Sequence, residues 1–284
     1  MKIIECPRDA MQGIKQLIPT ELKAKYINTL LKVGFDTIDF GSFVSPKAIP
    51  QLVDTAEVLK QLDLSTTKSK LLAIVANQRG AQDACHFDEI NYLGFPFSIS
   101  ETFQQRNANS SIAESLIRVE EIQTLCLKHK KELVVYISMA FGNPYGDVWN
   151  SDIVINWTKK LSDLGIKIIA LSDTIGVSNP ENINYLFSNI IPEFKNVEIG
   201  AHLHSTKEKA SEKIGAAYKS GCKRFDVAIH GFGGCPMAAD DLTGNLATED
   251  LESYFVNNNI ELNLNTEVLK EAYESSWNIF NNYH

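Results

Sequence analysis

The stretch Val197-Glu-Ile-Gly-Ala-His-Leu-His204 is the part of this sequence that decides both the fold and the chemistry we expect. It reads as a strand, and successive side chains on a strand point to opposite faces, so His202 and His204 share a face about 7 Å apart at Cα. Two imidazoles at a strand end can hold one divalent metal ion, but a bare His-x-His is as typical of polar residues where a strand reaches the surface. The positions of the other reactive residues decide between these interpretations.

Strand-like runs recur along the whole chain at steady intervals, and helix patterns separate them. The predicted strands are Ile3–Cys6, Thr37–Phe40, Leu71–Val75, Phe95–Ser100, Leu133–Ser138, Ile168–Leu171, Val197–His202 and Phe225–Ile229. The predicted helices are Thr20–Val33, Ser111–His129 with a capping box of Ser111 and Glu114, Ser151–Leu164, one starting near Pro180, Lys207–Ser220, and two starting near Thr248 and Thr266.

Eight strands alternating with helices predict an α/β fold, a parallel and closed (β/α)8 TIM barrel. An open doubly wound sheet is the competing fold, but no glycine-rich turn follows the first strand. Because no linker or low-complexity stretch divides the chain, we expect a single domain over residues 1–284. The barrel is expected over about 2–257 and a closing C-terminal helix over about 264–282.

Composition excludes several classes of protein. The net charge is −8 and no Lys/Arg stripe stands out, which argues against a nucleic-acid partner. No apolar run approaches the ~18–20 residues of a membrane span. A first strand that starts at Lys2 leaves no room for a signal peptide, and we expect a cytoplasmic protein. The five cysteines are odd in number and scattered, which favours reduced thiols: Cys6, Cys85, Cys126, Cys222 and Cys235.

Polar or reactive residues stand at or just after the end of every predicted strand, where the active sites of such barrels lie. In strand order they are Arg8 and Asp9, Asp39, Asn77, Glu101, Ser138, Asp173, His202 and His204, and the loop Gly231–Pro236 with Asn245. Loops are polar in any protein, so a few such residues would be unremarkable. Their presence at all eight strands favours a functional rim.

Several of these residues have a purely structural alternative. Asp39 should face the barrel axis with Arg8 as its partner, which could be only a structural pair. The glycine-rich loop could close over a substrate with Cys235 as acid or nucleophile, or be a tight turn with a buried thiol. Asn245 offers an amide oxygen to a hard cation, although a role near a helix N-cap is possible, which Thr248 fills better.

Two imidazoles, one carboxylate and one amide oxygen form a mixed nitrogen and oxygen donor set. No thiolate is obvious among them. This combination suits Mg²⁺ or Mn²⁺ better than Zn²⁺ and leaves positions open for substrate oxygens.

Six motifs in this order resemble the 3-hydroxy-3-methylglutaryl-CoA (HMG-CoA) lyase family. They are Arg8-Asp9 with Gln12, Ser42-Phe-Val-Ser-Pro46, Ser172-Asp-Thr-Ile-Gly176, His202-x-His204, Gly233-Gly-Cys-Pro236 and Gly244-Asn-Leu-Ala-Thr-Glu-Asp250. The resemblance runs from about residue 2 to about residue 257, and the last two motifs are much more specific than His-x-His.

The resemblance implies a lyase that cleaves HMG-CoA to acetyl-CoA and acetoacetate, as in leucine degradation. It implies a divalent metal, Mg²⁺ or Mn²⁺, an acyl-CoA partner and a homo-oligomer, expected to be a dimer. The implied metal ligands are Asp9, His202, His204 and Asn245. The implied catalytic residues are Arg8, which steadies the enolate oxygen, its partner Asp39, and Cys235 on the closing loop, while Gln12, Ser42 and Asp173 match substrate-pocket positions.

Retro-Claisen cleavage requires these groups. A metal lowers the pKa of the substrate hydroxyl, a fixed cation stabilises the enolate, and a base, either Asp9 or His202, takes the proton. The chain departs from the family at Ala10-Met11, at Asp39 where Glu is usual, and at Ser205-Thr-Lys-Glu208, where an Asp that would support the metal site is missing. Ser205 and Glu208 could instead form a capping box for the next helix.

Two other hypotheses remain at this point. One is a related metal-dependent aldolase or acyl-CoA condensing enzyme acting on another hydroxy- or oxo-acid, although the Gly-Gly-Cys-Pro sequence argues against the condensing branch. The other is a barrel that binds a CoA thioester or a metal without turnover, which the altered segment Ser205–Glu208 motivates.

Overall fold

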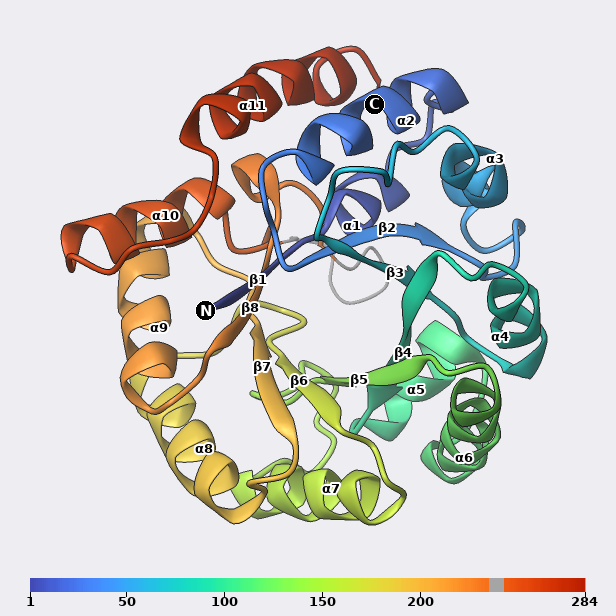
Figure 1. Ribbon diagram of the computed structural model, residues 1–284. Helices are drawn as coiled ribbons and strands as arrows, with labels where there is room; N and C mark the ends of the chain where they lie inside the picture. Colours follow the sequence, from blue (N-terminus) through green and yellow to red (C-terminus); the bar gives the residue numbers. More distant parts are fainter. Residues whose placement is uncertain (235–242, 284) are drawn as a thin grey trace.

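Eight short strands pair in sequence order, all in parallel, and close into a barrel (Figure 1). The computed structural model describes residues 1–234 and 243–283. The strands are β1 (Lys2–Glu5), β2 (Thr37–Ser42), β3 (Lys70–Ile74), β4 (Ile90–Ser98), β5 (Glu132–Ser138), β6 (Ile168–Ser172), β7 (Glu198–His202) and β8 (Arg224–Val227). Pairing of β1 with β8, in the register Ile3↔Phe225 and Ile4↔Asp226, closes the barrel. The predicted TIM barrel is confirmed.

Helices form a ring around the strands (Figure 1). They are α1 (Pro7–Gln12), α2 (Thr20–Leu31), α3 (Thr55–Leu59), α4 (Gln78–Cys85), α5 (Glu101–Ala108), α6 (Ile112–Lys128), α7 (Ser151–Asp163), α8 (Pro180–Glu193), α9 (Lys207–Lys219), α10 (Thr248–Asn257) and α11 (Thr266–Phe280), with 3-10 turns η1 (Pro50–Leu52) and η2 (Ile229–Gly231). The last helix, α11, packs on α2, where Phe280 meets Tyr26 edge to face. Within the described ranges, no helix is long and apolar enough to cross a membrane.

The predicted boundaries are wrong by two residues or more at both ends of β4 and at the C-terminal ends of β2 and β8, and several short helices were not predicted. β4 starts at Ile90 rather than Phe95, because the exposed Asn91 and the small Gly94 hide its apolar pattern. β7 ends at His202 as predicted, whereas β8 ends at Val227 rather than Ile229 because a 3-10 turn with left-handed His230 follows it. The helices α1, α3, α4 and α5 were not expected, since each is only five to eight residues long.

The predicted helix caps have mixed outcomes. Ser111 and Glu114 form the expected capping box. The box proposed for Ser205 and Glu208 is wrong, because α9 starts after Thr206 and the Ser205 hydroxyl donates to the carbonyl of Thr206 at 2.8 Å. Thr248 is also no N-cap: it is the first residue of α10, and its hydroxyl donates to Glu5 instead.

The interior of the barrel has an apolar side and a charged side. Alternate residues of a barrel strand face the axis. On β3 to β6 these residues form an apolar cluster of Leu72, Ile74, Tyr92, Val134, Tyr136, Ile168 and Ala170. On β7 and β8 the corresponding positions carry His202, Arg224 and Asp226, which are joined by ion pairs.

Glu5 at the end of β1 fastens the segment that closes the barrel. Its carboxylate is fully buried and accepts hydrogen bonds from the backbone N–H of Ile229 at 2.9 Å and from the hydroxyl of Thr248 at 2.6 Å. These two residues stand on either side of the loop that carries Asn245. Glu5 therefore anchors both ends of that loop to the first strand.

Replacing Glu5 with Gln should remove a pH dependence of stability. Burial raises the pKa of Glu5 to about 8, far above its ordinary value of 4.5, although Thr248 and Ile229 oppose the shift. Between these pH values the folded protein keeps a proton that the unfolded chain has lost. The free energy of unfolding therefore falls as pH rises, by at most about 1.4 kcal/mol per pH unit.

Urea unfolding near pH 6 and pH 8 measures this difference. We expect the wild type to lose about 2 kcal/mol between the two conditions relative to Glu5→Gln. An equal pH dependence of both proteins would show that Glu5 is already ionised in the folded state.

Candidate metal centre

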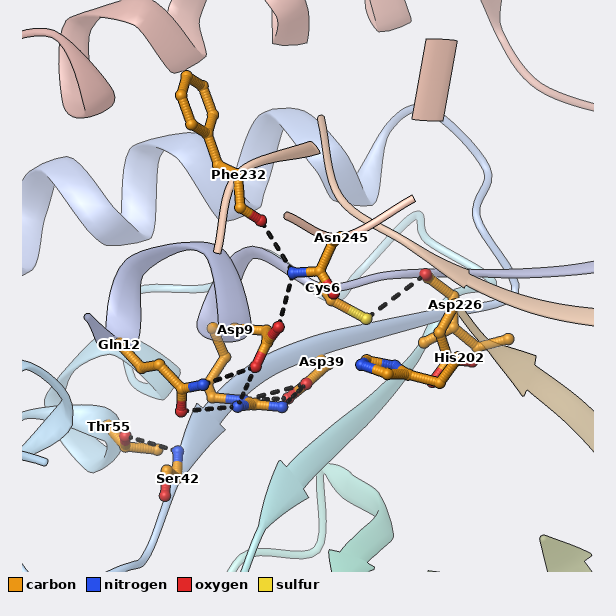
Figure 2. A network of polar contacts seen from close by, with 12 residues as sticks. Cys6, Asp9, Gln12, Asp39, Ser42, Thr55, His202, Asp226, Phe232 and Asn245 are labelled. Carbon is orange, nitrogen blue, oxygen red and sulfur yellow. Dashed lines mark hydrogen bonds and ion pairs between the residues drawn. The ribbon is translucent and has the colours of Figure 1, made fainter. Parts of the chain in front are cut away.

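Helix α1 turns three polar side chains toward the barrel mouth directly after β1. Pro7 stands at the start of this six-residue helix, which suits a residue with no N–H to donate. Arg8, Asp9 and Gln12 then form a closed set of hydrogen bonds: Nη1 of Arg8 donates to Asp9 and to Gln12, each at 2.9 Å, and Nε2 of Gln12 donates to Asp9 at 2.7 Å (Figure 2). Asp9 and Arg8 are only 6% and 7% exposed, so this is not a surface ion pair.

Asp39 on β2 receives the rest of the Arg8 guanidinium, as predicted. Nε of Arg8 lies 3.0 and 3.2 Å from the two carboxylate oxygens and Nη2 lies 2.5 Å from Oδ2. The shorter Asp side chain therefore still reaches Arg8. Burial raises the pKa of Asp39 to about 6, against the opposing charge and hydrogen bonds of Arg8. One N–H of Arg8 Nη2 has no hydrogen-bond partner among the described residues. This N–H is available to donate a hydrogen bond to an anionic oxygen.

Asn245 joins the final loop to the same cluster. A single β-bridge pairs it with His204, and its Nδ2 donates to Oδ2 of Asp9 at 2.6 Å and to the carbonyl of Phe232 at 2.8 Å (Figure 2). Gly233 makes this approach possible: a Cβ there would meet Nδ2 of Asn245 at 2.7 Å and the carbonyl of Asp9 at 2.8 Å, and its φ is +95°. The loop can therefore pack against α1 only with glycine at this position.

The side chains of Asp9, His202 and His204 present ligand atoms that all lie within 4.8 Å of one another. These residues fit a divalent cation on two further grounds. Nδ1 of His204 is buried without a hydrogen-bond partner in the described part of the chain, and Asn245 uses its N–H groups on Asp9 and Phe232, which leaves its oxygen as a further donor. Two imidazoles with two oxygen donors form a site for a hard or borderline metal.

A second group, Cys6 with His202 and Asp226, also has ligand atoms within 4.8 Å of one another. It suits a metal less well, because a thiol binds metals as its thiolate. Burial, followed by the nearby carboxylates of Asp226, Asp39 and Asp9, raises the pKa of Cys6 well above its ordinary value. We therefore take the group with Asp9 as the metal centre.

Electrostatics prepare this centre for a cation. Burial alone would raise the pKa of Asp9, but Arg8, the two histidines and Asn245 outweigh it and lower the pKa below its ordinary value. Burial, followed by the charge of His202, lowers the pKa of His204 to about 4. At neutral pH the centre thus contains a carboxylate and a neutral imidazole, the forms in which both groups bind metals.

The structure does not bring Asp173 to this cluster. Its carboxylate accepts hydrogen bonds from the backbone N–H groups of Val177 and Ser178 and from the Ser178 hydroxyl, and it pairs with Nζ of Lys213 at 2.9 Å. Lys213 in turn donates to the carbonyl of His204 at 2.8 Å. The carboxylate is buried and engaged with these partners, and through Lys213 it supports the backbone of His204; its predicted contact with the substrate stays a prediction.

The other predicted rim residues are dispersed. Ser42 ends β2, accepts from the N–H of Val44 at 3.2 Å, and lines a hollow of about 500 Å³ with Phe43 and Arg79. Asn77 caps α4, and Glu101 accepts from the N–H of Ile112. Ser138, which ends β5, is buried. Cys235 lies outside the described residues, so its role stays a prediction.

Sequence reasoning missed three charged residues that support the histidines: Lys213, Asp226 and Arg224. Oδ2 of Asp226 lies 3.3 Å from Nδ1 of His202, the contact by which a carboxylate orients a metal-binding imidazole. The available signal was the alternation Arg224-Phe-Asp-Val227, which places two charges on one face of a strand expected to be buried.

Together, the barrel and its mouth define a (β/α)8 protein with the donor set of a metal-dependent enzyme. The HMGL-like family model matches residues 2–275. The chain is 34% identical to the mitochondrial hydroxymethylglutaryl-CoA lyase of Bos taurus over 96% of its length and 83% of that protein, and 34% identical to hydroxymethylglutaryl-CoA lyase YngG of Bacillus subtilis over 94% and 88%.

Solved structures agree with this match. An HMG-CoA lyase from Acinetobacter baumannii, in complex with coenzyme A and 3-methylmalate, superposes with a TM-score of 0.90 at 30% identity over 98% of this chain and 90% of that one. The Bacillus subtilis HMG-CoA lyase gives 0.90 at 32% identity, over 98% and 92%. The chain belongs to the HMGL-like family, a family of carbon–carbon lyases, and the resemblance inferred from its motifs is confirmed.

Removing a metal ligand should abolish tight metal binding without unfolding the barrel. Loss of groups that merely support ligands costs about 10–100-fold in affinity, so Asp9→Asn and His204→Gln should each weaken Mn²⁺ binding by about 100-fold or more. Isothermal titration calorimetry of the metal-free protein measures this. His129→Gln, at the exposed end of α6, is the control and should bind as the wild type does. Unchanged affinity in Asp9→Asn would rule out the assigned centre.

Proposed function

We propose that this protein cleaves 3-hydroxy-3-methylglutaryl-CoA to acetyl-CoA and acetoacetate. The observation that carries the proposal is the convergence of Asp9, His202 and His204 within 4.8 Å beside the buried guanidinium of Arg8. The relatives named as HMG-CoA lyases and the related structure with coenzyme A support the substrate.

The chain's own residues suit the demands of a retro-Claisen reaction. Asp9, His202, His204 and Asn245 would hold the metal, which we propose to be Mg²⁺ or Mn²⁺ and which, when bound, would polarise the tertiary hydroxyl of the substrate and lower its pKa. Either Asp9 or His202 would accept the hydroxyl proton, and His202 could do so only through a ring nitrogen that is neither protonated nor bound to the metal. Asp9 is buried and the His202 side chain is 13% exposed, so little of either group is open to water.

Arg8 supplies the fixed positive charge for the enolate oxygen. Its guanidinium is held rigidly by Asp39, Asp9 and Gln12, with one N–H of Nη2 left over. A donor that is already oriented costs no reorganisation when charge develops on the substrate. We propose Gln12 and Ser42 as substrate-pocket residues and Cys235 as the residue that protonates the departing carbanion.

The decisive experiment is incubation of the purified protein with HMG-CoA and Mg²⁺ or Mn²⁺. Acetyl-CoA and acetoacetate should appear in equal amounts, and omission of the metal with a chelator present should stop the reaction. If a folded, metal-loaded protein forms neither product, the proposal fails. A panel of other hydroxyacyl-CoA esters and oxo-acids with acetyl-CoA then tests the related aldolase or condensing activity.

Arg8→Met should lower kcat by about 10³-fold while metal content stays near that of the wild type, because it removes a preorganised charge but no ligand. The substitution leaves Asp39 buried without its cation, so the double variant Arg8→Met/Asp39→Asn is the control for folding. Both variants should be equally inactive, and the double variant should be the more stable. Loss of the metal from the double variant would mean that Arg8 and Asp39 organise the centre rather than act on the substrate.

We also propose a cytoplasmic setting, a role in leucine degradation and assembly as a homodimer. Cys6, Cys85, Cys126 and Cys222 are free and buried, which suits a reducing compartment. Light scattering of the purified protein tests the dimer.

A further inference from the structure

A column of alternating charges crosses the barrel from its N-terminal end to the metal centre. Nζ of Lys2 donates to Oε2 of Glu198 at 2.5 Å, and Nη1 of Arg224 donates to Oε1 of Glu198 at 3.1 Å. Nε of Arg224 lies 3.9 Å from Oδ1 of Asp226, whose Oδ2 lies 3.3 Å from Nδ1 of His202. We call Lys2, Glu198, Arg224 and Asp226 the charge column.

The register of two neighbouring strands builds this column. Gly200 pairs with Arg224 and His202 pairs with Asp226, so the charged residues of β8 sit beside alternate residues of β7. A Cβ at Gly200 would meet Cδ of Arg224 at 2.8 Å. The absence of a side chain at Gly200 therefore leaves the space in which the Arg224 side chain lies inside the barrel.

Arg224 and Asp226 are 1% and 2% exposed, so each needs the other as a counter-charge. Oδ1 of Asp226 and Nε and Nη2 of Arg224 make no hydrogen bond within the described ranges. One carboxylate oxygen thus faces the guanidinium and the other faces the imidazole. An apolar residue at position 224 would pack more easily in such an interior, which indicates that the cation serves something other than packing.

We propose that Arg224 is a positioning residue for the metal centre: it holds the side chain of Asp226 turned toward Nδ1 of His202. Asp226 then accepts a hydrogen bond from Nδ1–H of His202. This hydrogen bond keeps His202 in the tautomer whose unprotonated Nε2 can bind the metal. This inference rests on the proposed function only in naming the metal, since the tautomer is a property of the metal-free protein.

The alternative is a column that only stabilises the barrel. Three variants separate the two: Asp226→Asn replaces the carboxylate with a neutral amide that can also donate, Arg224→Met removes the cation, and Arg224→Lys restores a cation of different shape. Arg224→Met/Glu198→Gln removes both members of the Arg224–Glu198 ion pair and leaves Asp226 in place, which gives a second form without the guanidinium. Lys23→Met is the matched control, because Lys23 is also buried and paired, with Asp54 at 2.7 Å, but lies on α2.

The primary readout is the pair of ¹⁵N chemical shifts of the His202 imidazole in the metal-free protein, recorded at a pH high enough that the ring carries a single proton, because, against the opposing effect of burial, Asp226 and Asp9 raise the pKa of His202. Wild type, Arg224→Lys and Lys23→Met should show a protonated Nδ1 and a free Nε2, whereas Asp226→Asn and both Arg224→Met variants should show a mixture of tautomers. Mn²⁺ affinity by calorimetry should fall about 10–100-fold in the same variants and recover in Arg224→Lys. In the double variant Arg224→Met/Asp226→Asn, Mn²⁺ affinity should be no lower than in Asp226→Asn alone, because both substitutions act through the same contact with His202.

The proposal is overturned if Arg224→Met lowers the melting temperature as Lys23→Met does but leaves both the tautomer and the metal affinity unchanged. It is also overturned if the losses in Arg224→Met and Asp226→Asn are additive. If the wild type binds metal with the predicted tautomer but does not cleave HMG-CoA, the proposed substrate fails while the role of Arg224 stands.

Discussion

The buried carboxylate of Asp9 is the group on which the mouth of this barrel depends. It accepts hydrogen bonds from Arg8, Gln12 and Asn245. One of its oxygens lies within 4.8 Å of a ring nitrogen of each of the two histidines. A buried charge is tolerated only when it is paired, so Asp9 holds its neighbours as much as they hold it. Through this one residue, the start of the chain, the seventh strand and the final loop meet at a common point.

The rest of the fold supplies this meeting with rigid supports. Lys213 fastens the backbone of His204 from the helix side, Asp226 holds His202 from inside the barrel, and Glu5 anchors the loop of Asn245 at both ends. Each support comes from a different strand or helix. A metal site that is held from several elements keeps its geometry when substrate exchanges, which a site on one loop could not do.

The barrel was predictable from the sequence because regular alternation of apolar runs and helix patterns has few other solutions. Asp9, Asp39, His202, His204 and Asn245 were predictable as neighbours because parallel strands place their carboxyl ends at one rim. The residues that support them, Glu5, Lys213, Arg224 and Asp226, could not be predicted as their neighbours. Thr248 and Glu5 lie 243 residues apart, and Lys213 and Asp173 lie 40 apart. Arg224 and Asp226 alternate with apolar residues. This pattern is the same whether the charged face of the strand points to water or to the barrel axis.

The contacts of Asp173 could not be derived from the motif in which it stands. Asp173 follows β6 at the rim of the barrel, as predicted. Its carboxylate oxygens, however, accept hydrogen bonds from Ser178 and from Lys213 on α9. The motif alone does not reveal these partners. The segment Ser205–Glu208 is a similar case, because helix α9 starts at Lys207 as predicted but Thr206, and not Ser205, is its N-cap residue.

Anomalous diffraction from crystals soaked in Mn²⁺ tests the central claim most directly. We predict one strong peak at the barrel mouth, within about 2.0–2.3 Å of a carboxylate oxygen of Asp9 and of one nitrogen each of His202 and His204. A peak between Cys6, His202 and Asp226, or no peak at the mouth in crystals saturated with the metal, would contradict the account.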